Sequence, residues 1–198
     1  MLRIAVFVSG GGTNLQALID AQKAGKNPNG EIALVLSSSK KAYALERARQ
    51  NGIATEILPR RQYATVDAYD EALLQIMERY RIDLVVLAGF MCILGSKFTK
   101  AYDRRIINVH PSLIPSFCGD GFYGIHVHEA ALSYGVKVTG ATVHFVNEIT
   151  DGGQIIMQKA VDVLPNDTPE TLQRRVMEEA EWVILPKTVQ MICNGEIQ

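Results

Sequence analysis

Cysteine is scarce in this chain, and its three residues lie far apart. Cys92, Cys118 and Cys193 form no Cys-x-x-Cys pair among the 198 residues. An odd, scattered set of cysteines does not supply the disulfide framework of a small secreted domain. A chain of this length buries roughly 70% of its unfolded surface without such cross-links. We therefore expect a hydrophobic core to hold the fold together in a reducing compartment.

Long apolar runs and an excess of one charge are also missing. No apolar stretch approaches the ~18 residues of a membrane span, and the run within Met1–Ser9 is too short for the core of a signal peptide. A net charge of −1 argues against a broad nucleic-acid or membrane-surface footprint. We expect a cytoplasmic protein with neither nucleic acid nor membrane as a partner. Without repeats, low-complexity tracts or linkers, residues 1–198 are expected to form a single domain.

The first part of the chain alternates short apolar runs with helical patterns. Near-continuous apolar runs such as Leu84–Ala88 indicate strands buried on both faces, as in a parallel sheet. The alternation predicts an α/β fold with an open, doubly wound and mostly parallel sheet. The expected strands are Arg3–Val8, Glu31–Ser37, Ile53–Leu58, Asp83–Ala88 and Arg105–His110. The expected helices between them are Asn14–Gly25, Ala42–Asn51 and Asp67–Arg81.

The pattern of the chain changes after residue 110. A loop rich in glycine, proline and aromatic residues, Pro111–Ile125, precedes a short helix over His126–Tyr134. Two alternating strands, Val136–Asn147 and Gly153–Leu164, are joined by an acidic, glycine-containing turn, which indicates an antiparallel β-hairpin. A long final helix is predicted over Thr168–Asn194, because a threonine can cap its start and a glycine follows its end.

A glycine-rich stretch, Ser9–Gln16, follows the first strand and opens the first helix. Glycines allow a sharp turn and a close approach to a ligand, and a helix N-terminus offers N–H groups that suit phosphate. The stretch lacks the Lys-Ser/Thr pair of a triphosphate-binding loop, and Leu15 stands where the dinucleotide fingerprint has its third glycine. A phosphate monoester fits better than either ligand. A tight turn without a ligand is the alternative.

Two polar side chains, Asn108 and His110, stand at the end of the fifth strand. Residues two apart in a strand project to the same face, and Pro111 ends the strand. Ligands of open α/β sheets bind at this carboxyl edge, where the glycine loop also lies. Asparagine can donate to a developing oxyanion, and histidine titrates near neutral pH. The pair is therefore a candidate catalytic site, with a hydrogen-bonded packing histidine as the alternative.

Asp151 lies in the turn of the predicted hairpin, directly before two glycines. An aspartate in this context is ordinarily a turn residue. If the hairpin folds over the sheet edge, a carboxylate within ~4–6 Å of His110 would raise the pKa of the histidine. That contact would turn His110 into a general acid.

The remaining histidines do not form a metal-binding pattern. His126 and His128 are two residues apart, and His144 lies on a predicted strand. A metal site needs three or four convergent ligands, and neither a cysteine cluster nor a His-Glu-x-x-His motif accompanies these residues. We therefore expect no metal.

Several stretches of the chain match one family in order and cover essentially its whole length. They are Ser9–Asp20, Val86–Met91, Ile107–Pro115, Thr142–Val146 and Asp151–Gln158. In these blocks the sequence resembles the phosphoribosylglycinamide formyltransferases, also called glycinamide ribonucleotide transformylases, within the formyltetrahydrofolate-dependent formyltransferase family. The resemblance implies transfer of a formyl group from 10-formyltetrahydrofolate to the amine of glycinamide ribonucleotide, a step of purine biosynthesis.

The resemblance also implies binding residues for two small-molecule substrates. The substrate phosphate would be held by Gly12, Thr13 and Asn14, and Glu181 would lie near the amine end of that substrate. The folate pocket would be lined, largely through backbone groups, by Met91, Cys92, Ile93 and Leu94. Val66 stands where some members have a basic residue that reaches the folate tail. The protein is expected to be a monomer or a homodimer.

The catalytic roles implied by the resemblance fall on three residues. Asn108, which also borders the folate, and His110 would polarise the formyl carbonyl and stabilise the tetrahedral oxyanion. Asp151 would keep His110 protonated and help to move protons. One alternative is another formyltetrahydrofolate-dependent formyltransferase or hydrolase. A second is a non-catalytic phosphate-binding module, which would use the glycine loop without needing the three catalytic residues together.

Overall fold

A mixed β-sheet forms the centre of the computed structural model, which describes residues 1–197. Within these residues the sheet has seven strands in the order β3-β2-β1-β4-β5-β6-β7. The pairs from β3 to β5 are parallel, and β5–β6 and β6–β7 are antiparallel. The strands are β1 (Leu2–Val8), β2 (Gly30–Ser37), β3 (Ala54–Ile57), β4 (Leu84–Leu87), β5 (Ile106–His110), β6 (Val138–Phe145) and β7 (Ile155–Asp162).

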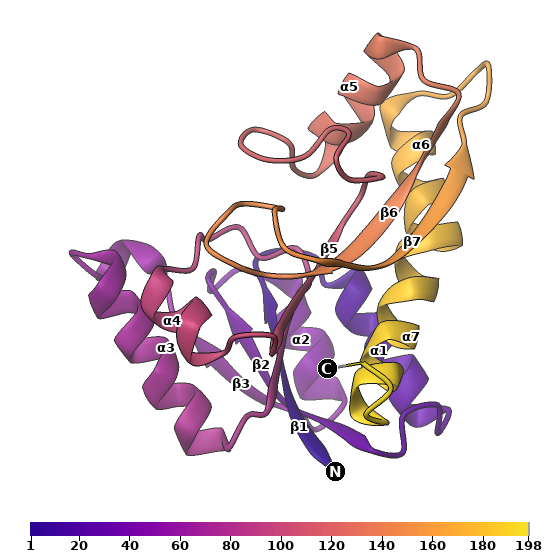
Figure 1. The fold of residues 1–198 in the computed structure, drawn as a ribbon. Helices are drawn as coiled ribbons and strands as arrows, with labels where there is room; N and C mark the ends of the chain where they lie inside the picture. Colours follow the sequence, from indigo (N-terminus) through magenta and orange to yellow (C-terminus); the bar gives the residue numbers. More distant parts are fainter. Residues whose placement is uncertain (198) are drawn as a thin grey trace.

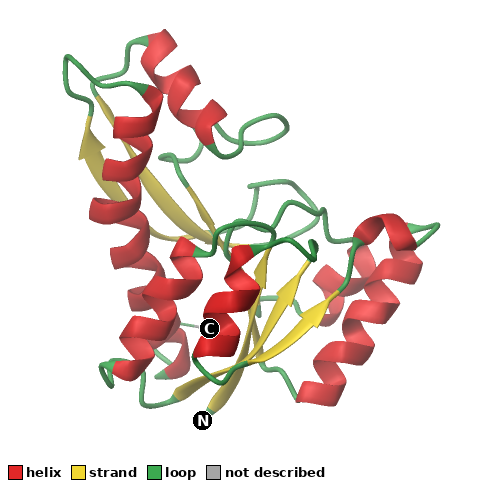
Figure 2. Cartoon of the chain, turned by 180° about the vertical axis from the view of Figure 1, so that it is seen from behind, coloured by secondary structure: helices red, strands yellow, loops and turns green. Residues whose placement is uncertain are grey.

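Helices cover both faces of the parallel part of the sheet (Figures 1 and 2). The helices before the hairpin are α1 (Thr13–Lys23), α2 (Tyr43–Gln50), α3 (Val66–Tyr80) and α4 (Ser96–Ala101), with a 3₁₀ turn η1 (Arg60–Gln62). The later helical elements are α5 (Ile125–Tyr134), α6 (Pro169–Val176), a π-helical turn η2 (Met177–Glu181) and α7 (Trp182–Cys193). In Figure 1, β6 and β7 extend beyond the parallel strands and lie beside α5 and α6.

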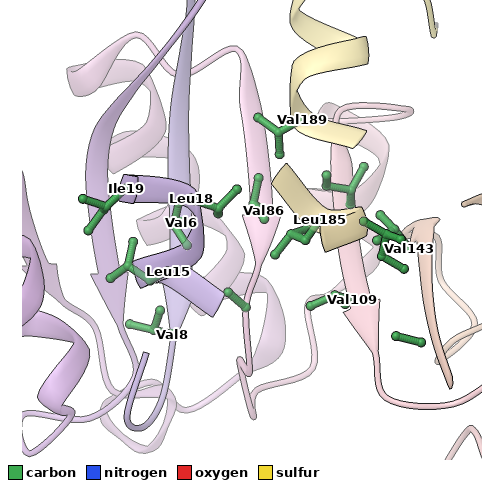
Figure 3. Packing of buried hydrophobic residues seen from close by; sticks show 14 of the residues in the cluster. Val6, Val8, Leu15, Leu18, Ile19, Val86, Val109, Val143, Leu185 and Val189 are labelled. Atoms are coloured by element: carbon green, nitrogen blue, oxygen red, sulfur yellow. The ribbon is translucent and has the colours of Figure 1, made fainter. Parts of the chain in front are cut away.

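Alternate residues of the central strands feed two separate hydrophobic cores. In β1, Val6 joins the core beneath α1, α2 and α7, whereas Phe7 joins the core beneath α3 and α4. Figure 3 shows the first core, with Leu15 and Leu18 of α1 and Leu185 of α7 against the strands. Burial on both faces explains why these strands are apolar without alternation. The predicted doubly wound, mostly parallel sheet with a C-terminal antiparallel hairpin is confirmed.

The final helix differs from its prediction in one respect. It starts after Thr168 and ends before Gly195 as expected, and the Thr168 side chain accepts a hydrogen bond from the Thr171 backbone N–H at 3.3 Å. Between α6 and α7, however, the backbone widens into the π-helical turn η2. Pro186 follows in the first turns of α7 and lacks the N–H that an α-helix needs at this position. Within residues 1–197, no helix combines the length and apolar character that crossing a membrane requires.

The short helix α4 was not predicted, because its six residues are too few for a periodic pattern. Its start depends on Asp70, a fully buried residue of the distant helix α3. The Asp70 carboxylate accepts hydrogen bonds from the backbone N–H groups of Gly95 and Phe98, both at 3.0 Å. Asp70 thus caps a helix that lies some 25 residues further along the chain. This contact also anchors the segment between β4 and α4.

Replacement of Asp70 by alanine is expected to lower the free energy of unfolding by about 2–4 kcal/mol, because two buried N–H donors lose their acceptor. Asp70→Asn keeps one acceptor oxygen and should lose less. Asp67→Ala removes an exposed carboxylate from the first turn of the same helix and should change stability by less than about 1 kcal/mol. Urea unfolding of the three variants measures these differences, and equal stability of Asp70→Ala and the native protein would contradict the capping role.

Candidate active site

A cavity of about 320 Å³ opens at the carboxyl edge of the sheet, where β4 and β5 end. It is bounded by the segment after β4, the end of β5, the loop before α5 and the turn of the β6–β7 hairpin. Among its lining residues are seven of the predicted site residues: Met91, Cys92, Ile93, Leu94, Asn108, His110 and Asp151. The structure therefore brings together the residues expected to bind folate and those expected to be catalytic.

His110 is contacted on two sides, by a backbone carbonyl and by a carboxylate. Its Nε2 lies 2.8 Å from the carbonyl oxygen of Phe117, and its Nδ1 lies 3.6 Å from Asp151 Oδ2. Because a carbonyl only accepts, Nε2 carries the proton that donates to Phe117. Phe117 and Asp151 both have left-handed backbones, with φ of 48° and 53°. Strained conformations of this kind concentrate at functional sites.

Asp151 reaches the cavity from the hairpin turn and bridges several groups. Its Oδ2 accepts a hydrogen bond from the Gly119 backbone N–H at 2.9 Å, and its Oδ1 lies 3.6 Å from His144 Nε2. Together with the approach of His110, these contacts confirm that the hairpin folds back over the sheet edge. They also tie the turn of the hairpin to the loop Ser116–Ile125.

His144 is a member of this cluster that the sequence did not single out. It is 1% exposed and lies opposite Asn108 in the β5–β6 pairing, with Asn108 Nδ2 3.2 Å from His144 Nε2. Its Nδ1 donates to the carbonyl of Phe145 at 2.8 Å, which leaves Nε2 as the acceptor for Asn108 in the neutral ring. The antiparallel register of the hairpin with β5 would have predicted this contact. A single sequence does not specify that register.

Burial controls the proton balance of the cluster. It lowers the pKa of His110, while the nearby Asp151 and the Phe117 carbonyl act in the opposite direction and His144 adds to the lowering. Asp151 by itself thus raises the pKa of His110, as expected. Desolvation of the imidazolium acts against that proton and is the larger effect in the free protein, so the pKa of His110 is lowered on balance. The role of Asp151 in keeping His110 protonated stays a prediction.

The Asp151 carboxyl has its pKa shifted in the direction that keeps it ionised. Burial alone would raise the pKa, but the nearby His144 ring, the hydrogen bond from the Gly119 backbone N–H and the proximity of His110 together lower it. In the free protein at neutral pH, the cluster therefore pairs a carboxylate with an uncharged His110. A second buried histidine, His128 of α5, has its pKa lowered to about 4 by burial and by His110.

The glycine loop lies beside this cavity and not within its walls. Gly12 has φ +74°, and a side chain there would meet Ala44 of α2 at 2.6 Å, so only glycine fits. Thr13 begins α1 directly after the loop, so the first N–H groups of the helix have no acceptor within the helix and are available to a ligand. The Ser9 hydroxyl accepts a hydrogen bond from the Met91 backbone N–H at 2.8 Å. This contact joins the loop to the segment that lines the cavity.

Glu181 comes from the other end of the chain to meet the start of α1. It closes the π-helical turn η2, is 6% exposed, and accepts a hydrogen bond from Asn14 Nδ2 at 2.6 Å. Burial raises the pKa of Glu181 to about 6, against the lowering effect of the Asn14 amide. Two residues predicted to contact the same substrate are thus in direct contact. Within residues 1–197 no group of histidine, cysteine and acidic side chains is arranged to hold a metal ion.

Comparison with known proteins agrees with this geometry. Residues 2–189 match the family described as formyl transferase. The chain is 40% identical over 197 residues to phosphoribosylglycinamide formyltransferase of Escherichia coli (strain K12), covering 100% of this chain and 90% of that protein. It is also 42% identical over 196 residues to the trifunctional purine biosynthetic protein adenosine-3 of Homo sapiens, covering 99% of this chain but only 19% of that protein.

Solved structures give the same result. The fold superposes on glycinamide ribonucleotide transformylase 1 from Symbiobacterium toebii with a TM-score of 0.92 and 42% identity, over 98% of this chain and 89% of that one. Phosphoribosylglycinamide formyltransferase from Bacillus halodurans matches with a TM-score of 0.89 and 39% identity, over 96% and 94% of the two chains. The family match and the full-length identity lead to one conclusion: the chain belongs to the formyl transferase family.

Proposed function

We propose that this protein transfers a formyl group from 10-formyltetrahydrofolate to the amine of glycinamide ribonucleotide in de novo purine biosynthesis. The observation that carries the proposal is the cluster of a buried His110 with the half-buried Asn108 and Asp151. It lies beside a phosphate-suited helix N-terminus in a chain 40% identical to a phosphoribosylglycinamide formyltransferase. Both substrates are small molecules. The cytoplasmic location and the choice between monomer and homodimer stay predictions.

The two substrates would meet between the glycine loop and the cavity. The N–H groups of Gly12, Thr13 and Asn14 suit the phosphate, and Glu181 lies within reach of the same substrate through its contact with Asn14. The segment after β4 would bind the folate, because its residues 91–94 line the cavity and belong to no helix or strand, so their backbone groups take no part in regular pairing. The amine and the formyl carbon would then meet at the end of β5.

The reaction forms a bond between the amine nitrogen and the formyl carbon and breaks the bond from that carbon to N10 of the folate. Negative charge gathers on the formyl oxygen, and Asn108 Nδ2 and His110 Nε2 are the N–H donors suited to it. In the free protein these donors are paired with His144 and with the carbonyl of Phe117. The formyl oxygen would take the place of these acceptors, so the donors are oriented before the substrate arrives.

A proton must leave the attacking amine and another must reach N10. His110 is neutral and Asp151 is ionised in the free protein, so the pair can accept the proton that the amine loses. Once His110 is charged, the carboxylate 3.6 Å from its Nδ1 stabilises the imidazolium. The imidazolium can then donate to the leaving N10. Asp151 therefore acts on a proton gained during the reaction and not on one already present.

Loss of His110 or of the Asp151 charge is expected to reduce turnover by at least ~100-fold, the usual scale for a positioned acid–base group or oxyanion donor. The assay supplies 10-formyltetrahydrofolate and glycinamide ribonucleotide to the native protein, His110→Ala and Asp151→Asn. His126→Ala is the matched control, because His126 is exposed and pairs with Glu129 outside the cavity. Native-like turnover of either variant would remove its assigned role.

The same assay separates the proposed reaction from its alternatives. A hydrolase would release formate from 10-formyltetrahydrofolate without the amine substrate, and a binding module would give no turnover at all. A formyltransferase of different specificity would leave glycinamide ribonucleotide unformylated. Formation of the formylated ribonucleotide in proportion to the tetrahydrofolate released is the result that we expect.

Removal of the substrate phosphate tests the role of the glycine loop. We expect the KM of glycinamide riboside to exceed that of the ribonucleotide by at least ~10-fold, because charge-assisted hydrogen bonds to the helix N-terminus are lost. Initial rates with each substrate at saturating folate measure the difference. Equal KM values would contradict a phosphate site at this loop.

Glu181→Gln is expected to stabilise the fold while weakening substrate binding. The rise of the Glu181 pKa from 4.5 to about 6 means that the folded protein binds more protons than the unfolded chain between these values. Stability contributed by the protonated form is therefore lost as the pH rises through this window, by about 2 kcal/mol in total. The neutral amide avoids this loss and can still accept from Asn14.

Urea unfolding at pH 4.5 and pH 7.5 measures the effect. Glu181→Gln should be more stable than the native protein by up to about 2 kcal/mol at pH 7.5 and equal to it near pH 4.5. Glu179→Gln, an exposed neighbour in the same turn, is the control and should show no such pH-dependent gain. If Glu181→Gln is less stable than the native protein at pH 7.5, the expectation that the buried Glu181 carboxylate destabilises the fold is wrong. A higher KM for the ribonucleotide is expected in parallel.

A further inference from the structure

The peptide groups of the glycine loop are oriented by helix α2, which packs behind the loop. The backbone N–H of Ala44 donates to the Gly10 carbonyl at 3.1 Å. One residue further along the loop, Arg47 Nε donates to the Gly11 carbonyl at 2.8 Å. Two successive loop carbonyls therefore point toward α2 and are held there by donors from that helix.

The positions of these carbonyls determine where the next N–H groups point. In a trans peptide the carbonyl of one residue and the N–H of the next lie in one plane and point in opposite directions. With the Gly10 and Gly11 carbonyls directed at α2, the N–H groups of Gly11 and Gly12 point away from α2. They add to the first N–H groups of α1, and successive backbone N–H groups at a helix N-terminus are suited to anions.

Arg47 is itself fixed in position. Its Nη1 donates to Gln16 Oε1 at 3.0 Å, and its guanidinium lies 5.1 Å from the centre of the Tyr43 ring. Among residues 1–197 no carboxylate forms an ion pair with it, although the exposed Arg49 of the same helix pairs with Glu46. The half-buried charge of Arg47 therefore stands unneutralised directly behind the loop.

We infer that Arg47 is a positioning residue for the phosphate of the substrate: it holds the Gly11 carbonyl away from the ligand and supplies positive charge behind the loop. The inference rests on the proposed function, because it takes the phosphorylated substrate to bind at Gly12–Asn14. Arg47 acts through the backbone of the loop, so its contribution is made only to a substrate that carries the phosphate. The reacting groups at the end of β5 do not contact it.

Arg47→Gln tests the inference by its selectivity between substrates. We expect the KM of glycinamide ribonucleotide to rise by about 10-fold, the scale of one charge-assisted hydrogen bond. The kcat should stay within about twofold, and the KM values of 10-formyltetrahydrofolate and of glycinamide riboside should not change. Arg49→Gln is the matched control, because it removes the same charge from the same helix without touching the loop. It should leave all four values unaltered.

The outcomes of the Arg47→Gln experiment either support the inference or overturn it. Equal increases in KM for the ribonucleotide and the riboside would overturn the inference, because they would indicate general damage to the site. If Arg47→Gln fails to fold by circular dichroism, Arg47→Lys, which keeps the charge but loses the fork of donors, must show a smaller rise confined to the ribonucleotide; no such rise would also overturn it. Failure of the proposed function can be told apart from failure of this inference, because in the first case the native protein would not formylate the ribonucleotide at all.

Discussion

The antiparallel pairing of β5 with β6 holds the candidate catalytic side chains in place. Up to β5 the sheet is parallel, and the reversal at β6 brings a strand of the hairpin alongside Asn108 and His110. The register places Asn108 opposite His144 and His110 opposite Thr142. Because side chains alternate between the two faces, a slip by one residue would turn every one of these groups away from its partner. The chemistry of the cavity therefore depends on backbone hydrogen bonds at some distance from the substrate.

The register is reinforced by a polar contact just outside the cavity. The buried hydroxyl of Thr142 donates to the carbonyl of Ser112 at 2.7 Å and accepts from the backbone N–H of Ile114 at 3.1 Å. Gln158 Nε2 of β7 also donates to the Thr142 hydroxyl at 3.0 Å. One side chain thus ties β6, β7 and the segment after β5 together. It fixes the start of the loop whose Phe117 carbonyl faces His110.

The sequence was informative where a local rule has a geometric consequence. The alternation of side chains in Asn108-Val109-His110, the proline that follows, and the glycine loop before α1 all predicted positions at the carboxyl edge of the sheet, and the structure agrees. It was uninformative where the cause lies far along the chain. The capping of α4 by Asp70 and the place of His144 beside Asn108 both depend on tertiary contacts. Whether the pKa of His110 is raised or lowered depends on how completely the ring is buried, and residue type alone does not specify this burial.

The π-helical turn before α7 constrains the length of the chain as well as its composition. A π turn accommodates one residue more than an α turn, and one residue in an α-helix corresponds to a rotation of about 100°. Glu181 closes this turn and faces Asn14, whereas α7 beyond it packs Leu185 and Val189 into the core beneath α1. Both halves of the helix can be in register with their surroundings only because the extra residue absorbs the mismatch. A one-residue deletion here would leave a more regular helix that satisfies either the carboxylate contact or the hydrophobic packing, but not both.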